Sequence, residues 1–70
     1  MNLRDKQITV GELLDNPRSK AVFQRRFGRF MKHPMVSAAR TLSLEQLEEM
    51  ASIYLPRQTI QETLRELEQL

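Results

Sequence analysis

The chain has 70 residues, a net charge of +2, and neither cysteine nor tryptophan. The lack of cysteine excludes disulfides, thiol redox chemistry and metal centres with cysteine ligands. No run of about 18 apolar residues is present, which excludes a membrane-spanning helix. The first residues lack the apolar stretch of a secretory signal, so we expect a cytoplasmic protein.

The first structural signal along the chain is a helix start at Thr9. Residues 1–7 are polar and aperiodic, which predicts a disordered N-terminus before a single helical domain over residues 8–70. Thr9 and Glu12 have the spacing of a capping box, in which each side chain accepts a hydrogen bond from the other residue's backbone N–H. This box predicts a short helix over residues 10–15.

A second helix is predicted over residues 18–28. Pro17 disfavours helical geometry at the residue before it, so it ends the first helix. Its missing N–H costs nothing in the first turn of the next helix. Gly28 is a candidate to end that helix in the left-handed conformation.

The second half of the chain repeats this pattern. Ser43 and Gln46 form another capping box, which predicts a helix over residues 44–53. An apolar stripe predicts a last helix over residues 57–69. A weaker segment near residues 35–40 predicts an extra helical turn. No alternating strand pattern is present.

The two halves resemble each other, because residues 8–13 match residues 42–47 in pattern. Neither half alone can cover its apolar face, so the two are expected to pack on each other. We therefore predict an all-α fold. The expected architecture is a compact four-helix domain of two short-helix/long-helix units, with the extra helical turn near residues 35–40.

Large apolar side chains at helical spacing mark the predicted core. A domain of this size is expected to build a core without room for a deep internal pocket as well. The predicted core residues are Leu13, Leu14, Phe23, Phe27, Phe30, Leu47, Met50, Ile60, Leu64 and Leu67.

Charge is distributed unevenly along the chain. Residues 18–40 contain seven basic residues and no acid, whereas residues 41–70 contain six Glu and two Arg. This asymmetry indicates either basic and acidic helices that lie side by side or a surface for an anionic partner.

Five basic residues are the candidate contacts for a partner or an anion: Arg18, Arg25, Arg26, Arg29 and Lys32. Of the two interpretations we expect the pairing of helices. Arg25 or Arg26 should then bind an acidic helix, while Arg29 and Lys32 stay unpaired.

No catalytic or metal-binding constellation is visible in the sequence. His33 is the only histidine, and no serine has a credible His–Asp pair to activate it. Gly11 and Gly28, the only glycines, do not form a glycine-rich phosphate loop. We therefore predict a protein that is not an enzyme and holds neither cofactor nor metal.

Several short motifs together resemble a small helical domain that is often appended to the C-terminal end of bacterial carbohydrate-active enzymes and esterases. These motifs are ITVGELLDNP at 8–17, AVF at 21–23, HPM at 33–35 and LSLEQL at 42–47, with Leu64 and Leu67. The resemblance covers nearly the whole chain from Ile8. It implies an all-helical bacterial accessory module without catalytic residues.

A more distant resemblance is to the family of unknown function associated with hybrid-cluster proteins. It rests on the Thr-x-x-Glu-Leu-Leu opening at 9–14, the Phe27–Gly28 pair and the later Leu-rich helix. The paired cysteines of that family would fall near residues 31–33 and are absent, so its redox role is not implied here.

The function expected from these observations is a non-catalytic helical accessory or protein-interaction module. Its partner would be another protein, an attached enzyme domain, or a second copy that forms a homodimer through an uncovered Met and Leu patch. The alternative is a small basic protein that binds nucleic acid through residues 18–32. No membrane partner is expected.

Overall fold

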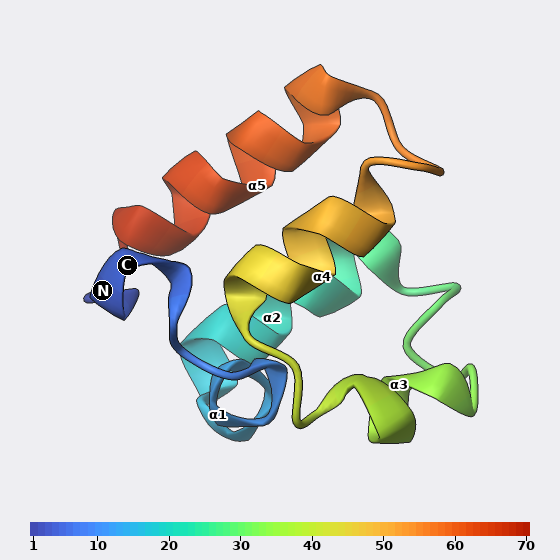
Figure 1. The fold of residues 1–70 in the computed structure, drawn as a ribbon. Coiled ribbons are helices and arrows are strands. Elements are labelled where there is room, and N and C mark those ends of the chain that lie inside the picture. The colour runs from blue at the N-terminus through green and yellow to red at the C-terminus, as the bar shows by residue number, and fades with distance from the viewer.

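Five α-helices and one 3₁₀ turn follow one another in the computed structural model, which covers residues 1–70 (Figure 1). They are η1 (Arg4–Lys6), α1 (Val10–Asp15), α2 (Pro17–Phe27), α3 (Met35–Ala39), α4 (Leu44–Ala51) and α5 (Arg57–Glu68). No β-strand forms apart from one isolated bridge. The predicted all-α class is confirmed, and each predicted helical segment is present with nearly the predicted bounds.

Three of these helices begin where their side chains cap the backbone. The Thr9 hydroxyl accepts from the Glu12 N–H at 3.1 Å, and the Glu12 carboxylate accepts from the Thr9 N–H at 2.9 Å. Ser43 and Gln46 form the second predicted box in the same way. At α2 the Asn16 side chain accepts from the second residue of the helix, which starts at a proline.

The starts of α1 and α4 are tied together by backbone hydrogen bonds. The Val10 N–H donates to the Leu42 carbonyl, and the Leu44 N–H donates to the Ile8 carbonyl, both at 2.8 Å. Beside them the Gly11 N–H donates to the carbonyl of Arg40 at 2.9 Å. A Cβ at Gly11 would lie 3.0 Å from that oxygen, so glycine permits the close approach.

The core lies between α1, α2, α4 and α5. In Figure 1 α5 crosses one side of the molecule, α4 lies below it and α2 lies behind. The Cα radius of gyration is 11.0 Å, as expected for a folded chain of this length. The buried apolar residues are Leu3, Ile8, Val10, Leu13, Leu14, Val22, Phe23, Leu44, Ile60, Leu64 and Leu67.

Two predicted core residues are exposed. Phe30 is 61% exposed because α2 ends at Phe27, so Phe30 falls in the turns beyond the helix and leaves the apolar stripe. Met50 is 44% exposed because the inner face of α4 passes through Leu44 and Ala51 instead. Phe27 and Leu47 are only half-buried.

Gly28 does not take the left-handed conformation expected of it. Its φ is −50° and its ψ is −36°, so the chain leaves α2 through further right-handed turns. A Cβ at Gly28 would lie 2.8 Å from the Gln24 carbonyl oxygen. Glycine is therefore required here by close packing of the backbone and not by a positive φ.

Residues 1–7 are packed against the domain, unlike the disordered terminus predicted from sequence. Leu3 is buried in the core, and the Met1 ammonium donates to the Glu68 carbonyl at 2.9 Å and also to that of Leu70. The two chain ends therefore lie side by side (Figure 1). The turn between these anchors is left-handed, with positive φ at Arg4, Asp5 and Lys6.

Candidate functional site

An apolar groove of about 310 Å³ lies between α2, α3, α4 and α5. Its walls are core-facing side chains that include Phe23, Phe27, Val36, Leu47, Ala51 and Leu64. The groove exists because α3 is short and contributes no buried residue, so the core stays uncovered on this side. The groove is open to solvent, so it leaves the expectation that so small a domain has no deep internal pocket unchanged.

Two large apolar side chains of the groove lining are left in water. Phe30 and Tyr54 line the groove and are 61% and 83% exposed. We call these two residues the apolar mouth. Met35 and Ile53 are exposed as well and adjoin lining residues in the sequence. Exposed aromatic side chains on an apolar groove are typical of surfaces that bind other proteins.

Most of the groove lining is apolar, and two of its polar groups are hydrogen-bonded within the fold. The Glu48 carboxylate accepts from the Lys6 ammonium at 2.8 Å, and the Thr63 hydroxyl donates to the Thr59 carbonyl at 2.8 Å. Tyr54 carries the remaining polar side-chain group of the lining, a hydroxyl on an exposed ring. The groove is thus suited mainly to apolar groups.

Two of the predicted contact residues form ion pairs inside the fold. Arg25 pairs with Glu66, and Arg26 Nε lies 2.8 Å from Glu66 Oε1. Arg26 Nη1 also lies 4.0 Å from Glu62 Oε2. The expectation that the basic α2 would bind an acidic helix is confirmed, since both glutamates belong to α5.

The other three predicted contact residues are exposed and form no ion pair: Arg18, Arg29 and Lys32. Arg29 and Lys32 flank the lining residues Phe30 and Met31 in the sequence but do not line the groove themselves. Arg18, in the first turn of α2, does not line it either. The five candidates therefore divide into two that pair with α5 and three that are exposed, unpaired and outside the groove lining.

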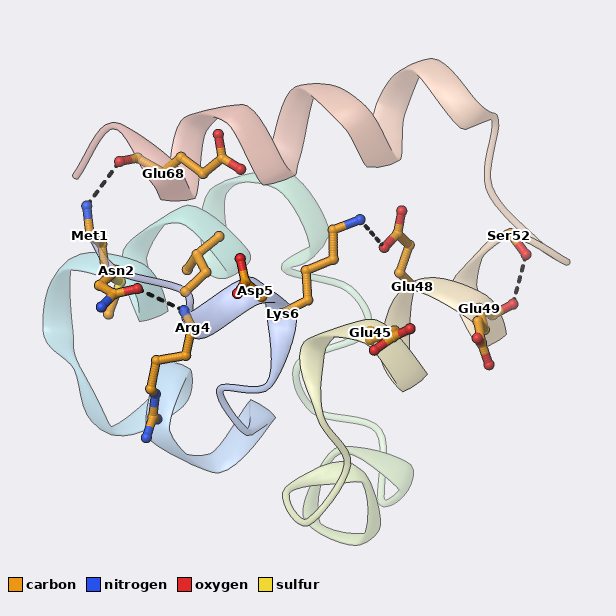
Figure 2. Close-up of a pocket in the computed structure, with 11 residues that line it drawn as sticks. Met1, Asn2, Arg4, Asp5, Lys6, Glu45, Glu48, Glu49, Ser52 and Glu68 are labelled. Carbon is orange, nitrogen blue, oxygen red and sulfur yellow. Dashed lines mark hydrogen bonds and ion pairs between the residues drawn. The ribbon is translucent and has the colours of Figure 1, made fainter.

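A second, wider hollow of about 780 Å³ has charged walls (Figure 2). η1 forms one wall, and α4 contributes Glu45, Glu48 and Glu49 to the other. Lys6 reaches across it to Glu48. No group of three residues in the structure is placed to hold a metal ion. The hollow is larger than the apolar groove, but most of its lining side chains are polar or charged, and its two basic residues, Arg4 and Lys6, each form an ion pair.

Glu12 is the carboxyl group whose pKa is clearly lowered in the fold, and it lines neither the groove nor the hollow. The Thr9 N–H holds the pKa of Glu12 below its ordinary value, and the nearby Arg4 guanidinium acts in the same direction. Both interactions belong to the start of α1. This lowered pKa is therefore a property of the capping box and not of a reactive site.

Sequence reasoning missed the apolar mouth, because it placed Phe30 in the core and gave no role to Tyr54. The available signal was the position of each residue beside a helix breaker. Phe30 follows Gly28, and Tyr54 stands two residues before Pro56. Both side chains consequently lie in turns that carry them away from the packed helix faces.

No helix of the structure combines the length and the apolar character needed to cross a membrane. Comparison of the chain with protein-family models, with curated proteins and with solved structures finds no match.

Proposed function

We propose that this chain is a non-catalytic module that binds another protein through the apolar groove. The observation that carries the proposal is the apolar mouth, where Phe30 and Tyr54 stay exposed at the opening of an uncovered core. Aromatic side chains beside a preformed pocket are the usual energetic anchors of protein interfaces. The partner is a separate protein or an enzyme domain attached to this one, as the resemblance to accessory domains implies.

We also propose that residues 8–70 form one helical domain of two related units, against which residues 1–7 pack. One unit is α1 with α2, the other is α4 with α5, and α3 is the extra turn between them. The bridge between Thr9 and Ser43 supports this division, because it joins equivalent positions of the two units.

The test is selection of displayed random 16-residue peptides on the folded domain, followed by affinity measurement with the selected peptides. We expect micromolar binders whose affinity falls at least tenfold in a Phe30→Ser, Tyr54→Ser variant. The matched control is Arg18→Ser with Lys20→Ser, which alters exposed residues that do not line the groove. Circular dichroism confirms folding of both variants. Selected peptides that bind the double serine variant as well as the wild type would contradict the proposal.

A second copy of the chain is the other partner that the apolar mouth admits. Sedimentation at two protein concentrations separates this homodimer from a heterologous partner. If the wild-type mass doubles at the higher concentration while the Tyr54→Ser variant stays a monomer at both, the mouth is a homodimer interface.

Nucleic-acid binding through residues 18–32 is the second candidate function. The observation that favours it is the set of exposed cations without an ion pair, Arg18, Lys20, Arg29 and Lys32. Its weakness is that Arg25 and Arg26 are bound to α5, which leaves no continuous basic face along α2.

A further inference from the structure

Glu48 belongs to both cavities of the molecule. It is the one charged residue in the lining of the apolar groove, and it lines the polar hollow as well. Its carboxylate lies 2.8 Å from the Lys6 ammonium, which also lines the hollow (Figure 2). The cation that pairs with the charge in the groove wall therefore comes from residues 1–7, a segment that contributes no side chain to the groove itself.

We call residues 1–7 the N-terminal strap. Three consecutive residues of the strap, Arg4, Asp5 and Lys6, have φ of 51°, 55° and 68°. This is the left-handed region, in which a Cβ is crowded against the backbone. None of the three residues is buried. Because strained backbone of this kind persists only where its surroundings hold it, the strap depends on contacts with the rest of the fold.

The contacts that hold the strap are few and lie apart from one another. Leu3 is buried in the core, and Lys6 and Gln7 each bond to a glutamate of α4. Arg4 pairs with the first turn of α1, and the Met1 ammonium donates to carbonyls at the end of α5. Much of the space between η1 and α4 is the polar hollow (Figure 2). Strained backbone with few contacts is expected to open locally before the fold unfolds.

Resting on the proposed function, we infer that the strap opens as a unit and thereby controls the affinity of the groove for uncharged apolar groups. In the closed strap Lys6 pairs with Glu48. When the strap opens, Glu48 loses this cation. Its side chain is only 21% exposed, so an apolar ligand that covers it would leave an unpaired carboxylate without water, which is unfavourable. By linkage, an apolar ligand in the groove also favours the closed strap.

Hydrogen exchange tests whether the strap opens by itself. The N–H groups of Lys6, Gln7 and Ile8 donate to carbonyls of the strap, whereas that of the buried Leu13 donates within α1. Corrected for intrinsic rates, the three strap amides should exchange together and at least about tenfold faster than the Leu13 amide. Equal protection of all four would overturn the inference, because the strap would then open only with the whole fold.

Two substitutions at Asp5 should move the strap in opposite directions. The Asp5 side chain is exposed and forms no ion pair, and both substitutions remove the same charge. Glycine adopts a positive φ readily, whereas a β-branched residue strongly resists it. Asp5→Gly should therefore slow the exchange of the strap amides, and Asp5→Val should speed it by about fivefold or more. Exchange in Asp5→Val at the wild-type rate would contradict the strained strap.

The uncharged apolar dye Nile red reports on the groove, because its fluorescence rises in apolar surroundings. Lys6→Gln leaves Glu48 unpaired and should weaken dye binding by about fivefold, the upper end for a partly exposed ion pair. Adding Glu48→Gln to Lys6→Gln removes the charge and should restore the affinity. Asp5→Val should weaken binding as well. The matched control Arg40→Gln removes one positive charge from an ion pair that no strap residue joins, and should leave the affinity unchanged.

The outcomes separate this inference from the proposed function. Dye binding that is lost in Phe30→Ser, Tyr54→Ser but is equal in the wild type, Lys6→Gln and Asp5→Val would refute control by the strap, while the protein-binding groove stands. A wild-type groove that takes up no dye would refute it too, and the peptide selection would then decide the proposed function on its own.

Discussion

Thr9 and Ser43 each cap the start of a helix, and they face one another across an isolated antiparallel bridge. The backbone bonds on both sides of this pair connect α1 directly to α4. Each hydroxyl therefore fixes the first turn of its own helix at the place where the two helices join. A cap lost at one residue should also loosen the backbone that supports the other.

The first prediction concerns these two caps. Thr9→Ala and Ser43→Ala should each lower the free energy of unfolding by about 1 kcal/mol, because an N–H in the first turn loses its acceptor. The double variant should deviate from the sum of the two, since the sites adjoin. Urea denaturation of the four proteins measures this. Thr9→Ser keeps a hydroxyl, so its free energy of unfolding should stay close to that of the wild type. If the effects of the two single substitutions add strictly, the bridge does not couple the two caps.

The second prediction ranks the three phenylalanines. Phe23→Ala should cost about 3–5 kcal/mol, because this side chain is buried and its ring centroid lies 6.5 Å from that of Phe27. Phe27→Ala should cost less, since Phe27 is half-buried. Phe30→Ala should change stability by no more than about 0.5 kcal/mol, as expected for an exposed position. Thermal and urea denaturation give the ranking of the three variants. A Phe30→Ala variant as unstable as Phe23→Ala would show that Phe30 is a core residue.

The helix starts were predictable because their signals are local. Thr9 with Glu12, and Ser43 with Gln46, need only a spacing of three residues to cap a first turn, and Pro17 restricts the residue before it in any context. The pairing of the basic α2 with α5 was also predictable, because charges of opposite sign were concentrated in separate segments.

The groove and the packed N-terminus were not predictable, because both depend on contacts between distant parts of the chain. The exposure of Phe30 follows from the exact end of α2, and Gly28 in the sequence indicates that a helix ends nearby but not that the chain continues in right-handed turns. Positive φ at Arg4, Asp5 and Lys6 costs about 1–2 kcal/mol per residue. Burial of Leu3 and the bonds of the Met1 ammonium offset this cost, and neither is visible in a polar sequence.

The third prediction compares two ion pairs. Arg26 and Glu66 keep side-chain exposures of only 25% and 26%, whereas Arg40 and Asp15 are 42% and 70% exposed. A double-mutant cycle to alanine should give a coupling energy near the upper end of about 0–1 kcal/mol for the first pair and near zero for the second. Raising the salt from 0.05 to 0.5 M should weaken the coupling energy of the Arg26–Glu66 pair only in part. Equal couplings would remove the structural role assigned to Arg26.

The fourth prediction uses the lowered pKa of Glu12. Because the folded state lowers this pKa below its ordinary value of 4.5, the carboxylate stabilises the fold above pH 4.5 and ceases to do so as the pH falls through the folded-state value. Glu12→Gln keeps an oxygen for the Thr9 N–H, as Gln46 does for Ser43, but does not titrate. The stability difference between wild type and Glu12→Gln should therefore shrink on acidification.

Urea denaturation from pH 6 down to pH 3 measures that difference. The matched control is Gln46→Glu, which places the same titrating group in the box at α4 and should make the chain more sensitive to acid. A difference between wild type and Glu12→Gln that is constant over this range would show that the carboxylate does not titrate with folding.

The last prediction separates a protein-binding module from a nucleic-acid binder. Arg25 and Arg26 are held by α5, so the cations left for phosphates are Arg18, Lys20, Arg29 and Lys32. We expect no binding to a random duplex or single strand tighter than about 100 μM at physiological salt, the weak end of non-specific affinity.

Fluorescence anisotropy at 50 and 200 mM salt measures this binding. A footprint on about four phosphates would lose on the order of a hundredfold in affinity between the two salts, because each neutralised phosphate releases counterions. Micromolar binding with that slope, abolished by Arg29→Glu with Lys32→Glu but retained in the folded Phe30→Ser, Tyr54→Ser variant, would assign Arg29 and Lys32 to nucleic acid. Weak binding that is equal in all variants would leave protein binding as the function to test.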